Sequence, residues 1–195
     1  MFCDFHTHCC DIPAGQTALI SAAVLPAAAP ANALYSLELH PWNLPDTFSG
    51  LPEVWADQLS RVCAVGEIGL DKCRGPALPV QMAFLRAALH EAQCRDLPVV
   101  IHCVRAFPEL QMVLREFRIS RLLFHGFRGS PEFLQQVRRA GFFTSSARGL
   151  PEDLLDCGLE TDDGDTALSG LYRSFAADPE KEKRLEENFR RFLKL

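Results

Sequence analysis

The chain has 195 residues, of which 48% are hydrophobic, with a formal net charge of -5. This length suits one domain with a sizeable core, and we expect a single domain over residues 1–195. The acidic balance argues against wrapping of long duplex nucleic acid, because such proteins present a clearly basic face. No segment reaches the roughly 20 apolar residues of a membrane span, and the N-terminus resembles no signal peptide, so we expect a cytoplasmic protein with no membrane partner.

The chain contains eight cysteines at irregular spacing, and most of them lie in apolar runs. No C-x-x-C pair occurs, and disulfides are rare in the cytosol. The pattern therefore predicts reduced core residues.

Strand-like and helix-like segments alternate along the chain. In order, we expect a strand at Phe2–His6, a second apolar run at Ala18–Leu25, a shortened connection at Pro26–Ala33, a strand at Leu34–His40, a helix at Leu51–Arg61, a strand at Val62–Leu70, a helix at Gln81–Arg95, a strand at Leu97–Cys103, a helix at Pro108–Phe117, a strand at Arg121–Phe127, a helix at Pro131–Arg139, and strands at Phe142–Ser145 and Leu154–Thr161. A closing helix begins at the N-cap Asp178, with Pro179 at its first position.

About eight near-continuous apolar strands, separated by helices or degraded crossovers, imply a parallel sheet. A closed (β/α)8 barrel fits best. Such barrels usually have about 250 residues, so this would be a compact, trimmed TIM-type barrel lacking helices after its first two strands. An open doubly wound sheet is the alternative.

Glu67 is set in the middle of an apolar strand, where an unpaired carboxylate costs several kcal/mol. Few cations are near it in sequence, so its partner is a distant arginine or a metal ion. An arginine partner for Glu67 stays possible at this point.

Other polar residues also fall at strand ends, where a barrel places its active site. These residues are His6 and His8 on the first strand, His40 on the third, His102 on the fifth, His125 on the sixth and Asp162 on the last. A single histidine of this kind is more often structural, and His90, in a helix, is interpreted as ordinary. The joint pattern favours metal, since imidazoles and carboxylates are ligands of Zn²⁺ and Mn²⁺, and a carboxylate such as Glu67 can bridge two ions.

Basic residues follow the same strands. Arg105 comes three residues after His102, Arg128 three after His125, and Arg148 closely follows the seventh strand. We expect a basic site within an acidic protein, suited to a nucleic-acid end or a small phosphate-bearing substrate. The alternative is that these arginines cap or salt-bridge loops.

Several motifs occur in the order and style of one known family. They are His6-Thr7-His8, Gly66-Glu67-Ile68-Gly69-Leu70-Asp71, Leu97–His102, His125–Ser130 and Glu160-Thr161-Asp162. Together with Gln81, Phe84 and the terminal Asn188–Phe192, they resemble the TatD family of metal-dependent hydrolases over nearly the whole chain.

The resemblance implies one or two divalent ions, Zn²⁺, Mn²⁺ or Mg²⁺. His6, His8, Glu67 and Asp162 would hold one ion, and His102 and His125 would hold a second, with Glu67 shared. Asp162 would also orient the attacking water or take its proton. By the same resemblance, His40 would contact the substrate phosphate.

The implied activity is metal-dependent phosphodiester cleavage at nucleic-acid ends, as in a TatD-like deoxyribonuclease. The chain departs from the family in its short segment between His8 and His40, and in Asp163-Gly164-Asp165 after the last ligand. Two alternatives follow: a hydrolase of a small amide, lactone or phosphomonoester, and a barrel that binds metal or a partner without turnover. A homodimer covering apolar surface around residues 18–33 is a further expectation.

Overall fold

The computed structural model describes all 195 residues. Its strands follow one another in chain order around a closed barrel, and the pairs that define the register are parallel. The strands are β1 (Phe2–Thr7), β2 (Gln16–Ala22), β3 (Ala33–Leu39), β4 (Ala64–Asp71), β5 (Val99–Val104), β6 (Leu122–Phe124), β7 (Phe142–Ser146) and β8 (Cys157–Leu159). The prediction of a compact, trimmed (β/α)8 barrel is confirmed, and the open doubly wound sheet is wrong.

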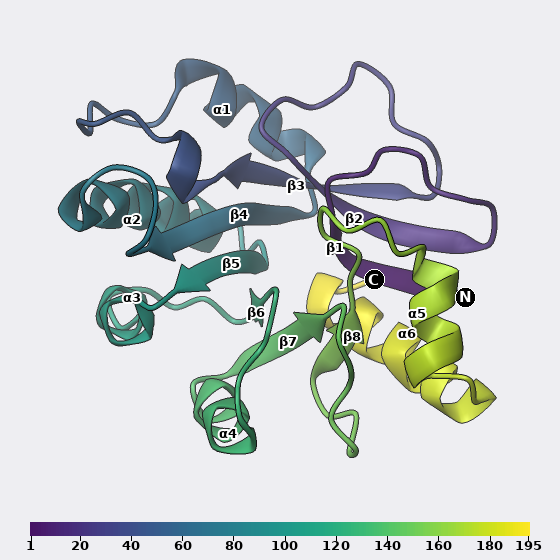
Figure 1. Ribbon diagram of the computed structural model, residues 1–195. Coiled ribbons are helices and arrows are strands. Elements are labelled where there is room, and N and C mark those ends of the chain that lie inside the picture. The colour runs from purple at the N-terminus through teal and green to yellow at the C-terminus, as the bar shows by residue number, and fades with distance from the viewer. The chain divides into compact units, whose positions relative to one another are not determined.

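Helices follow only some of the strands (Figure 1). They are α1 (Glu53–Gln58), α2 (Leu78–Cys94), α3 (Phe107–Leu114), α4 (Pro131–Arg139), α5 (Leu168–Phe175) and α6 (Pro179–Leu193), with the 3-10 turns η1 (Pro41–Asn43) and η2 (Leu59–Arg61). As predicted, no helix connects β1 to β2 or β2 to β3. None of these helices is long and apolar enough to cross a membrane.

The chain contains two compact units, each described here by itself. The second unit consists of Ser21–Pro26 and Tyr35–Leu122. Within it β4 pairs with β5, α2 packs on β4 and α3 packs on β5 (Figure 1). All eight residues of β4 are buried, because a parallel strand is covered on both faces.

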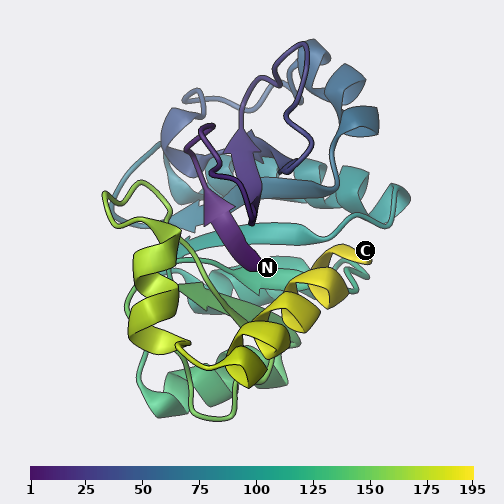
Figure 2. The same cartoon turned by 90° about the vertical axis from the view of Figure 1, so that its right-hand side faces the viewer.

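The first unit consists of Met1–Ile20, Ala27–Leu34 and Leu123–Leu195. In this unit α5 and α6 pack on β1 and β8, and α4 packs on β7; α5 and α6 are the light green and yellow helices of Figure 2. The side chain of Asp178 caps α6 by accepting a hydrogen bond from the Glu180 amide at 2.8 Å, as the sequence predicts. The single domain over residues 1–195 stays a prediction.

Some boundaries differ from the predicted ones. The last strand begins at Cys157 rather than Leu154, because Leu154 and Asp156 have left-handed φ angles of 49° and 48°, which interrupt an extended strand. The sixth strand ends at Phe124, just before the turn at Gly126, and α2 begins at Leu78 with proline in its first turn.

Two further expectations need correction. Helix α5 was not predicted, although Leu168, Leu171 and Tyr172 form its buried stripe at helical spacing. The assignment of the cysteines to the core is wrong for half of them, since only Cys3 and Cys157 are buried and four are exposed: Cys9, Cys10, Cys73 and Cys94. His90 lies at the surface, with 64% of its side chain exposed.

Candidate metal centre

In the first unit, β1 and the segment after β8 bring three predicted ligands together. The Asp162 Oδ1 atom lies 3.5 Å from His6 Nε2 and 3.8 Å from His8 Nε2. The backbone sets this geometry, because the Asp162 amide donates to the His6 carbonyl at 3.0 Å and Thr7 pairs with Asp162 in a parallel bridge. Asp162 has a left-handed φ of 53°, a conformation that aspartate tolerates better than most residues.

A buried network holds these two segments together. Thr161 donates its hydroxyl to Asp4 Oδ2 at 2.7 Å and its amide to Asp4 Oδ1 at 3.1 Å, and the hydroxyls of Thr161 and Thr7 are 2.8 Å apart. Burial raises the pKa of Asp4 to about 7, although the Thr161 hydrogen bonds oppose this shift. Asp4 therefore fixes the residue next to Asp162, a role that sequence reasoning missed.

The first unit also places His125, directly after β6, against His6, with ring centroids 4.4 Å apart. His6, His125 and Asp162 each offer a ligand atom, and these atoms lie within 4.8 Å of one another. Behind His125 lies Glu160, which accepts hydrogen bonds from the Gly126 amide and the Ser145 hydroxyl, both at 2.6 Å. Burial raises the pKa of Glu160, whereas the charges of His125 and His6 act to lower it.

A further carboxylate in this unit was not assigned a role from the sequence. Asp163, which replaces the expected motif after the last ligand, has an oxygen within 4.8 Å of ligand atoms of both His8 and Asp162. Asp163 is therefore an additional candidate ligand at the edge of the centre.

In the second unit, Glu67 and His102 lie in contact. Glu67 Oε1 is 2.5 Å from His102 Nδ1, and both side chains are more than 90% buried. The Glu67 amide donates to Ser21 Oγ at 2.8 Å, which holds its strand position. The carboxylate embedded in an apolar strand therefore has a partner, and that partner is a predicted metal ligand rather than an arginine.

On its other side, His102 meets Asp71. The Asp71 Oδ2 atom lies 3.2 Å from His102 Nε2. Burial acts to lower the pKa of His102, but the hydrogen bonds and negative charges of Glu67 and Asp71 outweigh it and raise the pKa. A metal-ligating histidine commonly donates its second ring N–H to a carboxylate, so Nδ1, the ring nitrogen opposite Asp71, is the candidate ligand atom of His102.

His40, predicted to contact substrate, also lies beside Glu67, with its Nε2 atom 3.2 Å from Glu67 Oε1. Its Nδ1 atom accepts a hydrogen bond from the Trp42 amide at 3.1 Å. A neutral imidazole that accepts at Nδ1 carries its proton on Nε2. In this tautomer Nε2 is a hydrogen-bond donor that faces Glu67. His40, Glu67 and His102 also offer ligand atoms within 4.8 Å of one another, and substrate contact by His40 stays a prediction.

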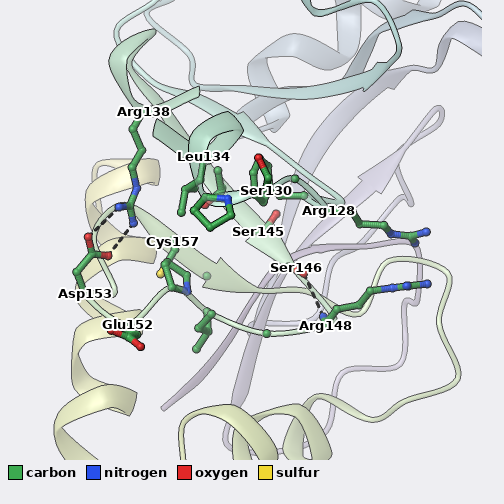
Figure 3. A pocket seen from close by; sticks show the side chains of 18 of the residues that line it. Arg128, Ser130, Leu134, Arg138, Ser145, Ser146, Arg148, Glu152, Asp153 and Cys157 are labelled. Carbon is green, nitrogen blue, oxygen red and sulfur yellow. Dashed lines mark hydrogen bonds and ion pairs between the residues drawn. The ribbon is translucent and has the colours of Figure 1, made fainter. Parts of the chain in front are cut away.

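The predicted phosphate-binding arginines lie on loops that follow strands. Arg105 follows β5 in the second unit. In the first unit, Arg128 and Arg148 line a cavity of about 780 Å³ together with Ser130 and Ser146, and their side chains project in the same direction (Figure 3). Arg138 in the same cavity pairs with Asp153 at 2.8 Å, whereas Arg128 and Arg148 form no salt bridge.

The donor set fits divalent metal ions. Tetrahedral ligand atoms bound at 2.0 to 2.2 Å are about 3.3 to 3.6 Å apart, close to the spacing of His6 and Asp162. His102 Nδ1 and Glu67 Oε1 are closer, at 2.5 Å, so these two atoms would have to separate to hold one ion between them. The division of the ligands between two ions, and the sharing of Glu67, stay predictions.

Comparison with known proteins also supports a metal centre. A model of the family described as TatD related DNase matches residues 6–151. The curated "Uncharacterized metal-dependent hydrolase YjjV" of Escherichia coli (strain K12) is 36% identical over 110 residues, covering 53% of this chain and 41% of that protein. The chain thus spans about two fifths of the length of this curated relative.

Solved structures show the same fold. The crystal structure of YjjV, a TatD homolog from Escherichia coli K12, aligns over 100% of this chain and 98% of that chain, with a TM-score of 0.74 and 23% identity. A TatD family hydrolase from Entamoeba histolytica has a TM-score of 0.62 at 16% identity, covering 83% of this chain and 73% of that chain. Since the family model covers most of the sequence, this chain belongs to the family of TatD related DNases.

Proposed function

We propose that this protein is a divalent-metal-dependent hydrolase that cleaves phosphodiester bonds at nucleic-acid ends. The observation that carries the proposal is the buried Glu67–His102 pair backed by Asp71. A buried imidazole between two carboxylates is a costly arrangement for stability alone, and it matches a metal ligand with its orienting carboxylate. Membership of the TatD related DNase family supports the same reaction class.

Divalent ions, when bound, would lower the pKa of water toward neutrality and stabilise the charge that develops on phosphate oxygens. Asp162 has 33% of its side chain exposed, so it can accept a proton from an entering water. His40 Nε2 faces Glu67 Oε1 at 3.2 Å, and it would donate to a phosphate oxygen once Glu67 holds an ion. Arg128 and Arg148, which have no carboxylate partner, can bind phosphate through charge-assisted hydrogen bonds.

Metal analysis combined with hydrolysis of short single-stranded DNA in Mg²⁺ or Mn²⁺ tests the proposal. We expect bound metal and release of nucleotides from one end, with Asp162→Asn reducing kcat by at least a hundredfold. The matched control is Asp165→Asn, an exposed aspartate three residues away, which should retain activity.

Other results would select the alternatives. Cleavage of small esters or amides without cleavage of DNA would favour a small-molecule hydrolase. Bound metal with no hydrolysis of either substrate class would favour a non-catalytic barrel. Failure to bind any metal would refute the assignment of the ligands.

A further inference from the structure

A large, partly exposed aromatic side chain lies beside His40 and His102, two of the candidate site residues of the second unit. Trp42 in η1 has 39% of its surface exposed. Its indole lies edge to face with the rings of His40 and His102, at centroid distances of 4.7 and 5.6 Å. The Trp42 Nε1 atom donates to Asp71 Oδ2 at 2.6 Å. The same carboxylate that orients His102 therefore also fixes the indole.

Arg74 lies over this indole, with its guanidinium carbon 4.0 Å from the ring centroid. Arg74 is exposed and forms no salt bridge. Lys72, two residues earlier on the same loop, is by contrast paired with Glu109 at 2.6 Å. The cation–π contact thus leaves the guanidinium N–H groups available to an anion while holding the charge in place.

The loop that carries Arg74 is fixed against η1. Asp71 Oδ1 accepts hydrogen bonds from the amides of Cys73 at 2.7 Å and Arg74 at 3.1 Å, and Gln81 Nε2 donates to the Arg74 carbonyl at 3.1 Å. At Gly75, with φ of +86°, a Cβ atom would lie 2.3 Å from the Pro41 carbonyl oxygen. Glycine is therefore required for this close approach, and the Trp42–Arg74 pair is preorganised rather than formed on binding.

We propose that Trp42 and Arg74 form a subsite for the nucleobase of a nucleotide whose phosphate lies at the Glu67–His102 ligands. Bases stack on exposed aromatic rings and on arginine planes with little dependence on sequence, and the Arg74 N–H groups are placed to bind the attached phosphate. This proposal rests on the proposed phosphodiester hydrolysis and adds to it a selection for a nucleobase rather than for phosphate alone.

Calorimetric titration of the metal-loaded protein tests the subsite without turnover. Thymidine 5′-monophosphate, ribose 5-phosphate and inorganic phosphate serve as probes. We expect the nucleotide to bind about tenfold or more tightly than either of the other two, a ratio typical of one stacked base. Nucleotide binding should also quench tryptophan fluorescence, since the second tryptophan, Trp55, is only 2% exposed.

Variants separate the two parts of the subsite. Trp42→Leu should bind the nucleotide no better than ribose 5-phosphate, whereas Trp42→Phe should keep part of the preference. Arg74→Lys keeps the positive charge but lacks the planar guanidinium group on which a base can stack. This variant should therefore retain phosphate binding and lose base preference. The controls are Phe48→Leu, which alters an aromatic residue of 43% exposure that packs on Phe84, and Arg118→Gln, an exposed arginine on another loop.

Equal affinity for all three probes would overturn the subsite, as would full base preference in Trp42→Leu. Ribose 5-phosphate binding as tightly as the nucleotide would replace base recognition by sugar recognition and would also overturn it. These results are distinct from failure of the proposed function. Base-selective binding without DNA hydrolysis would refute the catalytic proposal alone, and hydrolysis without base preference would refute the subsite alone.

Discussion

Replacement of Asp71 by asparagine should weaken metal binding and the fold together. Asp71 is 3% exposed. Its Oδ1 atom accepts two backbone amides, and its Oδ2 atom meets Trp42 Nε1 and His102 Nε2. An asparagine amide group must place its NH₂ on one side or the other, so two of these four contacts become donor–donor pairs. Hydrogen bonds to a charged group contribute about 1.5 to 3 kcal/mol each.

We therefore expect Asp71→Asn to lower the free energy of unfolding by about 3 kcal/mol and Tm by roughly 6 to 12 °C. Loss of the carboxylate that orients His102 should weaken metal binding about 10- to 100-fold. Thermal denaturation of the metal-free protein and competition with a chromophoric chelator measure the two effects separately.

The matched control is Asp46→Asn. Asp46 is an exposed aspartate of the same unit that takes part in no salt bridge. This variant should change neither quantity. If folded Asp71→Asn binds metal with the affinity of the unmodified protein, the orientation of His102 by Asp71 is refuted.

The remaining predictions concern the other site residues. His40→Gln should retain its metal content, measured by elemental analysis, while kcat for a phosphodiester falls, because Nε2 of His40 is set as a donor; loss of one metal equivalent would show it to be a ligand. Glu67→Gln should reduce both metal equivalents, whereas His125→Ala should reduce mainly one, and equal losses would show that the sharing is wrongly assigned. Arg128→Ala should raise KM for a phosphodiester with little change in kcat, and unchanged kinetics in this variant and in Arg105→Ala would exclude phosphate binding by these residues.

The sequence by itself was sufficient to predict the barrel and the types of residue that line the candidate centre. Buried parallel strands must be apolar almost throughout, so polar residues at their ends, such as His6 and His102, stand out without any coordinates. The N-cap Asp178 and Pro179 likewise predict the start of α6 because capping depends on a few local residues. The lack of a helix between β2 and β3 follows from the short Ala/Pro segment that connects them.

Only the tertiary structure decided which side chains meet and how each is oriented. The Trp42 amide sets the tautomer of His40, and Asp71 links His102 to Trp42; neither contact leaves a periodic signal in the sequence. Asp4 reads as one polar residue in a strand, yet it holds Thr161 beside Asp162. Such roles depend on hydrogen-bond geometry between residues distant in the chain, whereas strand and ligand type depend on local composition.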